Sequence, residues 1–417
     1  MFQMHCLSEM DAVVRPVQRQ APAACPRGAD SQPGHKTALY PMKRLVNLEA
    51  RTLEGRIREA TGLSADEFYE ALRQRRMTPQ VVFNVDVGCN QGCSHCFAAV
   101  RGGADVEAVG RSVSRARALG YGTLLFPTEP SVDPRTISLY ATAREDYLIT
   151  NGVEAEPLLE RMYAAGVRKL GVSLHGPDPE THGLLNGRAE SFERIVATVR
   201  KASTRFTVQL KTVVHGLNLP KLQQHFHFAH RIGAAEVQLI NLVKIGSAED
   251  LPEHYFLSHD DALQTLREVA VFTDRHRSPR ITFSALWGPN FHSRGVYQWL
   301  LGKAYAERPQ GNRWCPGGRS YFAVVGQEVY ACPNHTSDPD FVLGKWDDED
   351  GIQLTRDPWP GGNGDGSVGM CSPASCEYSH LCQGGCRLAA LADSGDASGS
   401  PAFCLTKLID ELLAEGT

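Results

Sequence analysis

The strongest constraint on the fold of this 417-residue chain is an alternation of strand-like and helix-like segments between residues 81 and 285. Short apolar runs predict strands at Val81–Val87, Thr123–Phe126, Tyr147–Thr150, Lys169–Leu174, Phe206–Val214, Glu236–Leu242 and Arg280–Ala285. Amphipathic segments between them predict helices at Val106–Ala118, Glu156–Ala165, Ser191–Ala202 and Leu219–Ile232. Repeated βα units of this length predict an α/β fold, with a parallel sheet or barrel and helices outside it.

A cysteine-rich run follows the first predicted strand directly. Its sequence, Cys89-Asn-Gln-Gly-Cys93-Ser-His-Cys96-Phe97, places three thiols on one short loop with C-x3-C-x2-C spacing. The loop stands at the carboxyl end of a strand, where reactive groups gather in parallel α/β folds. Three thiolates can hold three irons of a four-iron cluster and leave the fourth iron open to a small molecule. A zinc site, which usually takes four ligands, and a chance group of buried thiols are the alternatives.

Composition limits the classes of protein to which the chain can belong. The formal net charge is −4 with both signs mixed, so no nucleic-acid footprint is visible. No apolar run reaches the roughly eighteen residues that a membrane-spanning helix needs. The N-terminus lacks the pattern of a secretory signal, so we expect a cytoplasmic protein. In that reducing compartment, clustered thiols bind metal more often than they form disulfides.

Changes in composition along the chain predict four parts. These are a disordered leader, a helical extension, the alternating core and a cysteine-rich C-terminal part, at residues 1–36, 37–80, 81–310 and 311–417. Cys6 and Cys25 lie in the leader and are expected to be surface thiols. Ser64-Ala-Asp-Glu67 has the pattern of a capping box and predicts a helix start. The C-terminal part has too few apolar residues for a core of its own, so we expect metal to staple it before a final helix, Leu405–Leu413.

The cysteine loop and the strand order resemble the radical S-adenosylmethionine (radical SAM) superfamily, whose signature is this spacing followed by an aromatic residue, here Phe97. The resemblance extends from Val81 to Ala285 and implies a partial (β/α)6 TIM-like barrel. It implies a [4Fe-4S] cluster whose open iron chelates S-adenosylmethionine (SAM), held by Cys89, Cys93 and Cys96. It also implies that the reduced cluster cleaves SAM to methionine and a 5′-deoxyadenosyl radical, which removes a hydrogen atom from the substrate. The protein would position these groups and exclude water.

The same resemblance implies further residues in the cofactor site. Pro127-Thr128-Glu129-Pro130 stands where the family carries Gly-Gly-Glu-Pro. Glu129 is therefore expected to meet the ammonium group of SAM, and Thr128 to add a hydroxyl contact. A solvated loop acid is the alternative for Glu129. Phe97 is expected to belong to the same site, and Ser173 to hydrogen-bond the ribose or the methionine carboxylate.

Four further residues and one histidine-rich stretch allow more than one interpretation. His175 stands where the family has Asp, which leaves its role undefined. His182 and Arg188 continue the resemblance as a loop facing the barrel mouth, or are ordinary surface residues. Lys211 either reaches the cofactor carboxylate or extends its ammonium group to solvent. The stretch His225–His230 has helical spacing with interleaved phenylalanines, which predicts an amphipathic helix rather than a metal site.

The C-terminal cysteines resemble the SPASM extension of radical SAM enzymes, which carries two auxiliary [4Fe-4S] clusters. The resemblance implies an outer cluster held by Cys371, Cys376, Cys382 and Cys404, and an inner one held by Cys315, Cys332 and Cys386. The C-x4-C spacing at Cys371 departs from the usual C-x2-C. Tyr321 stands where full members have a further cysteine, so the inner cluster is expected to have an open iron or a ligand other than cysteine. A zinc ribbon that caps the barrel is the alternative.

Together these features imply an oxygen-sensitive oxidoreductase with three four-iron clusters. SPASM members commonly modify ribosomally made peptides, and we expect such a substrate here. Dehydrogenation or epimerisation of a sugar-like or other small natural product is the alternative. Residues 37–80 are too short for the leader-peptide-binding domain of many peptide maturases, and no spare cysteine outside the leader could donate hydrogen in an epimerase. A flavodoxin or ferredoxin is the expected electron donor. A non-catalytic metal-binding module is the hypothesis of another class.

Overall fold

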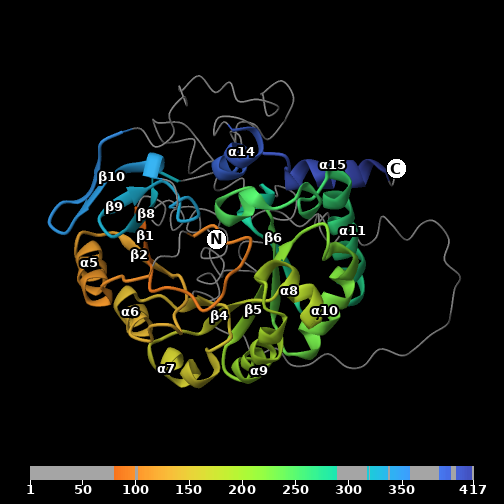
Figure 1. The fold of residues 1–417 in the computed structure, drawn as a ribbon, viewed down its shortest axis with the longest axis horizontal. Helices are drawn as coiled ribbons and strands as arrows, with labels where there is room; N and C mark the ends of the chain where they lie inside the picture. Colours follow the sequence, from red (N-terminus) through yellow and green to blue (C-terminus); the bar gives the residue numbers. More distant parts are fainter. Residues whose placement is uncertain are drawn as a thin grey trace, which may run out of the picture.

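The computed structural model describes residues 79–98, 102–288, 317–318, 320–336, 339–356, 385–395 and 401–415. Seven parallel strands alternate with helices through the first two of these ranges. The strands are β1 (Gln80–Val85), β2 (Gly122–Pro127), β3 (Tyr147–Thr150), β4 (Lys169–Ser173), β5 (Thr207–Val214), β6 (Glu236–Asn241) and β7 (Arg280–Phe283). The helices are α5 (Val106–Ala118), α6 (Thr136–Ala143), α7 (Leu159–Ala164), α8 (Pro179–Asn186), α9 (Phe192–Ala202), α10 (Leu222–Arg231) and α11 (His259–Arg275). The helices lie along the outer rim and the strands inside it (Figure 1).

The strands form two hydrogen-bonded sheets. β1 pairs with β2, and β3 to β7 pair in chain order, all in parallel. β2 and β3 lie next to each other, but the strand pairing is interrupted between them. This arrangement confirms the predicted α/β partial barrel and corrects it in one respect, because the wall is split after the second strand.

The C-terminal part contributes strands to the same wall. β8 (Tyr321–Val325) pairs in parallel with the outer edge of β1, and β9 (Glu328–Tyr330), β10 (Val342–Asp347) and β11 (Gly351–Leu354) continue it as an antiparallel meander. Trp346 of β10 packs edge-on against Phe83 of β1, with ring centroids 5.5 Å apart. β8 therefore covers an edge that would otherwise expose unpaired backbone groups. The strands of this part do not build a separate core, because Phe322, Val324 and Trp346 share the core of the barrel.

Side chains alternate between the two faces of each strand. On β5, Val208, Leu210 and Val214 belong to the main hydrophobic core. Gln209 and Lys211 point to the opposite face, the barrel lumen, where they bond to side chains of β6. This period of two predicts that the residue after Val214 also faces the lumen.

Most predicted elements are confirmed with shifted ends. The helix at Val106–Ala118 has the predicted bounds, whereas Glu156–Leu158 and Leu219–Lys221 are 3₁₀ turns that precede α7 and α10. The strand predicted to end at Val87 ends at Val85, because the following backbone turns toward the cysteine loop. Helices α6, α8 and α11 were not predicted.

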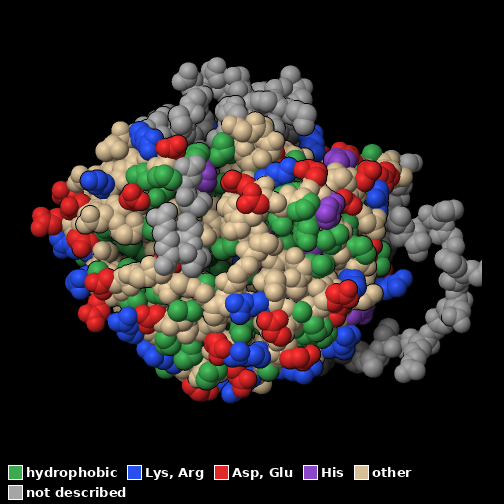
Figure 2. Space-filling view, viewed as in Figure 1, with side chains coloured by type: hydrophobic (Ala, Val, Ile, Leu, Met, Phe, Trp, Pro, Cys, Tyr) green, Lys and Arg blue, Asp and Glu red, His purple; other side chains and the backbone are tan. Residues whose placement is uncertain are grey.

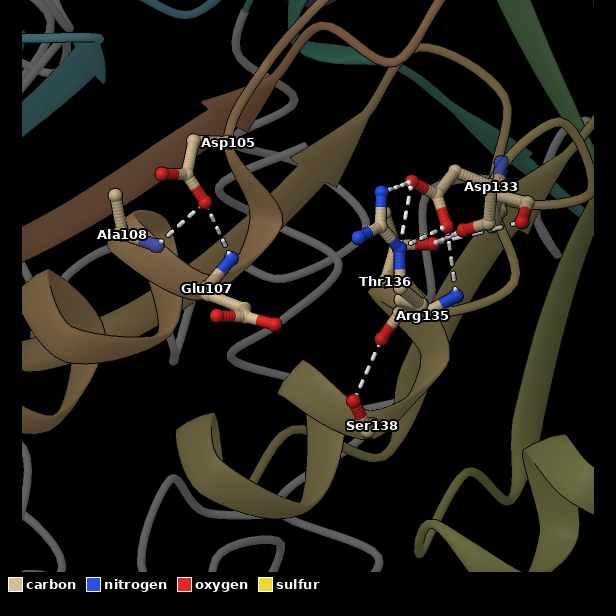
Figure 3. A network of polar contacts seen from close by, with 8 residues as sticks. Asp105, Glu107, Ala108, Asp133, Arg135, Thr136 and Ser138 are labelled. Carbon is tan, nitrogen blue, oxygen red and sulfur yellow. Dashed lines mark hydrogen bonds and ion pairs between the residues drawn. The ribbon is translucent and has the colours of Figure 1, made fainter.

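Aspartates order the loops before α5 and α6. Asp105 accepts hydrogen bonds from the backbone N–H groups of Glu107 and Ala108, at 3.0 Å each, and so caps α5 (Figure 3). Asp133 accepts from the Arg135 backbone N–H at 3.0 Å and pairs with its guanidinium just before α6. Asp105 is a common type of N-cap, but it lacks the Glu or Gln three residues on that makes a capping box easy to recognise. Asp133 precedes the N-cap of α6, Arg135, which has no side-chain cap.

The surface of the described part carries charges of both signs. Acidic and basic side chains are interspersed over the face shown in Figure 2. Among the described helices, none is long and apolar enough to cross a bilayer. The predicted leader, nearly all of the predicted helical extension and the segment 289–316 lie outside the described residues, although Gln80 begins β1 rather than ending a helix.

Candidate cofactor site

The three thiols of the cysteine loop lie together at the carboxyl end of β1. Cys89, Cys93 and Cys96 are all partly buried, and none forms a disulfide. Burial, together with the neighbouring Cys96 and Cys89, raises the pKa of Cys93 to about 12. The sulfurs are therefore close enough to repel one another as anions, and a bound metal group would offset that repulsion.

Residues far away in the sequence hold this loop. The Ser94 backbone N–H and hydroxyl both donate to the carbonyl of Leu185, at 2.9 and 3.0 Å. The Ser247 backbone N–H donates to the Cys96 carbonyl at 2.9 Å. Gly246 has φ +58°, and a Cβ there would lie 2.6 Å from the Cys96 oxygen. The loop is thus clamped between α8 and the segment after β6, and glycine allows the close approach.

Thr128 holds the start of the loop. Its hydroxyl donates to the carbonyl of Gly88 at 2.7 Å and accepts from the backbone N–H of Val87 at 3.1 Å. The family carries glycine at two positions where this chain does not. At one of them, Thr128 provides a side chain that holds the backbone before Cys89. Its contact with SAM stays a prediction. Phe97, at the other end of the loop, stacks on Phe126 of β2 with ring centroids 5.7 Å apart.

Glu129 is fully buried, so the alternative of a solvated loop acid is wrong. Its carboxylate accepts hydrogen bonds from the Thr150 hydroxyl at 2.8 Å and from the backbone N–H groups of Asn151 and Ser131, at 2.7 and 2.9 Å. Burial raises the pKa of Glu129, and these donors oppose that shift. No Lys or Arg of the described residues forms an ion pair with it.

Asn151 connects Glu129 to the cysteine loop, a link that the sequence analysis missed. Its backbone N–H donates to Glu129, and its amide Nδ2 donates to Asn90 Oδ1 at 2.6 Å and lies 3.7 Å from Cys89 Sγ. The only sequence signal was the Thr-Asn-Gly turn after the third strand. The turn requires glycine because Gly152 has φ +80° and lies against Val172. One residue, Asn151, therefore contacts a carboxylate through its backbone and a thiol through its side chain, and these two groups follow different strands.

Ser173 and Lys211 lie side by side in the lumen, as register partners on β4 and β5. Ser173 is half-buried. Lys211 is buried, and its Nζ donates to Gln238 Oε1 at 2.6 Å. Burial lowers the pKa of Lys211 to about 7. The alternative of a lysine with its ammonium in solvent is wrong, and its contact with a cofactor carboxylate stays a prediction.

A group of buried histidines surrounds the mouth. His182 Nδ1 accepts from the His175 backbone N–H, and His175 Nδ1 accepts from the Val213 backbone N–H, both at 3.2 Å. His175 also packs edge-on against His95 of the cysteine loop, with centroids 4.8 Å apart. Burial lowers the pKa of His182 to about 4. His182 is therefore not a surface residue, whereas Arg188 is exposed.

The histidine-rich helix behaves as predicted. His225 is buried and hydrogen-bonds the Thr212 hydroxyl at 2.8 Å, whereas His227 and His230 are exposed. The spacing thus reflects an amphipathic α10. Within the described parts of the chain, no group of three or more His, Cys, Asp or Glu side chains is arranged to hold a single metal ion.

Comparison with known proteins adds a family to this geometry. Residues 83–229 match the Radical SAM superfamily. This match spans β1 to α10 and includes the cysteine loop, Glu129 and Ser173. The chain contains a radical SAM domain. It is a radical SAM enzyme, and the hypothesis of a non-catalytic module is set aside.

The similarity of this radical SAM enzyme to its curated relatives extends beyond that domain. An AdoMet-dependent heme synthase of Methanosarcina barkeri is 26% identical over 356 residues, which cover 78% of this chain and 95% of the relative. The protein of the same name from Nitratidesulfovibrio vulgaris is 25% identical over 359 residues, covering 78% and 92%.

Two solved structures share the fold. Native anSMEcpe with bound AdoMet and Cp18Cys peptide has a TM-score of 0.57 at 18% identity, covering 81% of this chain and 97% of that one. Streptococcus suis SuiB bound to precursor peptide SuiA has a TM-score of 0.57 at 13% identity, covering 84% and 80%. At these identities the likeness concerns the fold alone.

The described C-terminal cysteines of the radical SAM enzyme lie above the barrel. Cys332 packs against a buried group that contains Cys386, together with Ile245 and Leu286, which follow β6 and β7. Cys404 directly precedes α15 (Leu405–Glu415). The remaining predicted ligands, Cys315, Cys371, Cys376 and Cys382, lie outside the described residues.

Tyr321 has a structural explanation. It begins β8, aligns with Gln80 of β1 and belongs to a small apolar cluster with Val82 and Tyr330. An aromatic ring at this position extends the core between the barrel and the meander. The sequence position that carries a cysteine in full SPASM members is thus part of a strand that packs on β1.

Proposed function

We propose that this radical SAM enzyme binds a [4Fe-4S] cluster and SAM at the carboxyl end of its barrel and modifies a ribosomally made peptide. The observation that carries the proposal is the link from the cysteine loop through Asn151 to the buried Glu129. A cluster and SAM, when bound there, would supply the electron and the 5′-deoxyadenosyl radical for hydrogen abstraction. The chain's own residues hold these groups and keep water away.

Each residue of the site would have a distinct task. Cys89, Cys93 and Cys96 would ligate the cluster, and the bonds to Leu185 and Ser247 would keep their loop rigid. Glu129 would accept the ammonium group of SAM. This assignment is supported by the burial of its carboxylate and by the lack of an ion-pair partner in the described residues, because a buried charge is stabilised by a counter-charge.

Side chains of the neighbouring strands would complete the cofactor site. Ser173, half-buried beside Lys211, would hydrogen-bond the ribose or the carboxylate. The stacked rings of Phe97 and Phe126 would cover the loop and exclude water. Thr128 would position Gly88 and could contact SAM only if its hydroxyl gave up a backbone partner.

The C-terminal part, residues 311–417, would form a SPASM domain with two auxiliary [4Fe-4S] clusters. Cys371, Cys376, Cys382 and Cys404 would hold the outer cluster, and Cys315, Cys332 and Cys386 the inner one. The packing of Cys332 against the Cys386 group, above β6 and β7, supports an inner site next to the barrel mouth. Such a cluster could receive the electron left on the substrate. A flavodoxin or ferredoxin of the reducing cytoplasm would deliver electrons to the first cluster.

The peptide substrate draws support from two solved neighbours with this fold, whose structures contain a peptide substrate or precursor. A second candidate function has an observation of its own. Relatives that are aligned over 78% of this chain are named heme synthases, so synthesis of heme is the competing activity. Modification of a sugar-like natural product has no comparable support among these proteins.

Anaerobic reconstitution tests the proposal. The wild-type chain should bind about twelve irons, as three four-iron clusters would, and release 5′-deoxyadenosine from SAM with dithionite. Zinc occupancy without cleavage of SAM would refute it. A candidate precursor peptide should increase that release and gain or lose mass. If a heme precursor increases it instead, and the absorbance of heme develops, the second candidate is correct.

A further inference from the structure

His215 is a buried histidine whose ring has no polar partner. It directly follows β5, at the carboxyl end of the strand where barrel enzymes place reactive and binding groups. Its exposed fraction is 0%, and neither ring nitrogen has a hydrogen-bond partner among the described residues. Buried polar atoms are rarely left in this state unless a water, ion or ligand supplies the missing partner.

The backbone at His215 is rigid, so a loose loop does not explain the unpartnered ring. The His215 N–H donates to Asn218 Oδ1 at 2.9 Å. The amide of Asn218 in turn donates to the carbonyls of His175 and Val213, at 2.9 and 2.8 Å. The Gly216 N–H donates to the Tyr255 carbonyl at 3.0 Å, and a Cβ on Gly216 would lie 2.4 Å from the His254 oxygen. The backbone thus holds His215 in place, whereas its ring nitrogens have no hydrogen-bond partner among the described residues.

The other histidines of the mouth differ from His215 in this respect. His175 and His182 accept backbone N–H groups, and His225 bonds to Thr212 on the helix side of β5. These three imidazoles stabilise the turn after β4 and the packing of α10. His215 makes no such bond and lies on the lumen side, in the alternating series of Gln209, Lys211 and Val213.

An aromatic ring packs on His215, and that ring adjoins an apolar cluster. The half-buried ring of Tyr255 stacks on the imidazole, with centroids 5.7 Å apart and planes 19° apart. Val213, Leu185 and Leu242 form an apolar cluster against which Tyr255 also packs. The carbonyl of Leu185 accepts the two hydrogen bonds from Ser94, so this cluster adjoins the cysteine loop.

The chemistry of this pocket favours an uncharged polar group. Burial lowers the pKa of His215 to about 3, so the imidazole is neutral and offers one N–H donor and one acceptor in the plane of the ring. The apolar neighbours would not stabilise a carboxylate. An amide carries both a donor and an acceptor, and its flat faces match the stacked tyrosine.

We propose that His215 and Tyr255 form a substrate subsite that binds an amide group of the peptide at the barrel mouth. This inference rests on the proposed peptide function and deepens it. The neutral His215 imidazole would offer no positive charge to the ionised side chains of a heme precursor. The Tyr255 ring covers the imidazole. The amide would reach the ring nitrogens of His215 by displacing the edge of the Tyr255 ring.

The test compares two probes that share an acetylated leucine and differ in the carboxyl-side group, which is an N-methylamide in N-acetyl-L-leucine N-methylamide and a carboxylate in N-acetyl-L-leucine. Their dissociation constants are measured by titration calorimetry on the reconstituted, SAM-loaded enzyme. The wild type should bind the amide about tenfold more tightly than the carboxylate, as one or two added hydrogen bonds allow. His215→Leu should remove this preference, and His215→Gln, which keeps a donor and an acceptor, should retain part of it. His230→Leu, on the exposed face of α10, is the matched control and should keep the full preference.

Three results would overturn the inference. They are equal or undetectable binding of the two probes by the wild type, an unchanged preference in His215→Leu, and a weakened affinity for SAM in His215→Leu that leaves probe binding intact. The last result would place His215 in the cofactor site. If His215→Leu does not fold, the His215→Gln and wild-type measurements still decide. Failure of the proposed function is read separately, from the absence of 5′-deoxyadenosine in the wild type.

Discussion

The amino and carboxyl ends of the barrel strands both bury polar side chains, but they treat them differently. At the amino ends, Glu236 accepts from the guanidinium of Arg280 at 2.6 Å, from the Thr282 hydroxyl at 2.8 Å and from the amide of Gln209, and Lys169 Nζ lies 3.7 Å away. Every member of this group, which we call the floor network, has a partner. Charge, hydrogen bonds and burial therefore balance within the protein itself.

At the carboxyl ends, the balance is incomplete within the described residues. Both ring nitrogens of His215, Nδ1 of His95 and the hydroxyl of Ser284 are buried without a hydrogen-bond partner. Glu129 is paired with neutral donors but with no cation of the described residues. The difference indicates that the floor network stabilises the barrel, whereas the mouth is completed by ligands. The predictions below test this division.

The largest expected effect is loss of catalysis on changing the cysteine loop. Cys93→Ala should abolish dithionite-dependent cleavage of SAM and lower the iron content by about four per chain, because a [4Fe-4S] cluster needs its three thiolates. The C-terminal clusters should remain. Release of 5′-deoxyadenosine is measured by chromatography and iron by colorimetry. Cleavage that survives the change would show that the first loop is not the site.

Breaking the floor network should cost stability but leave cofactor binding intact. Glu236→Gln removes the counter-charge of Arg280 and Lys169 and should lower the free energy of unfolding by about 3 kcal/mol, as for other broken buried pairs. Denaturant titration measures this. Glu253→Gln, which breaks an exposed pair with Lys244, is the control and should change little. A weakened affinity of folded Glu236→Gln for SAM would contradict the division.

Changing Glu129, the buried carboxylate of the mouth, should weaken the binding of SAM. Glu129→Gln keeps the shape of the side chain but loses the charge, so the dissociation constant for SAM should rise by about tenfold to a hundredfold. Equilibrium dialysis on the reconstituted enzyme measures it. Glu236→Gln serves as the matched control. Glu145→Gln is less suitable, because the Glu145 carboxylate accepts a hydrogen bond from the Leu125 backbone N–H inside the sheet. An unchanged affinity would exclude Glu129 from the cofactor site.

Lys211, between floor and mouth, should give stability a distinct pH dependence. Its pKa is lowered to about 7 in the fold from an ordinary value of 10.5. Between these two values the unfolded chain binds more protons, so the free energy of unfolding of the wild type should rise with pH relative to Lys211→Met. The slope should not exceed about 1.4 kcal/mol per pH unit. A difference between the two proteins that stays constant from pH 7 to 10 would show that the amine is charged in the fold.

The smallest effect is expected at Thr128. Thr128→Val removes the hydroxyl that donates to Gly88 and accepts from Val87, at a cost of about 1 kcal/mol in the free energy of unfolding. Thr128→Ser keeps the hydroxyl and should behave like the wild type. If Thr128→Val instead weakens SAM binding as strongly as Glu129→Gln does, the hydroxyl contacts the cofactor directly.

The sequence predicted the individual strands and the cysteine loop, because both have local signals. The strands β1 to β7 and the cysteine loop at the end of β1 were recognisable because apolar runs and cysteine spacing are local signals. The pairing of β8 with β1 was not, because the partner of a strand is decided by contacts between segments more than two hundred residues apart. The split between β2 and β3 was not recognisable either, because strand pairing is not a local pattern.

The site shows a similar limit. Glu129 and Ser173 came from a resemblance in motif, but the bridge through Asn151 depends on a turn geometry that no residue pattern encodes. Lys211 allowed two interpretations from sequence, and only the bond to Gln238 decides that its ammonium is buried. The sequence could not distinguish His215 from a core histidine whose ring is hydrogen-bonded. Only the structure shows that Asn218 accepts from the His215 backbone N–H while the ring nitrogens have no partner among the described residues.

The central claim, that the mouth carries out the chemistry and the floor only supports it, is tested most directly by one measurement. Dithionite-dependent release of 5′-deoxyadenosine is quantified for the reconstituted wild type, Glu129→Gln and Glu236→Gln at a temperature where circular dichroism shows all three folded. The account predicts release by the wild type and by Glu236→Gln, and a strong reduction in Glu129→Gln. Equal losses in the two variants, or no release by the wild type, would contradict it.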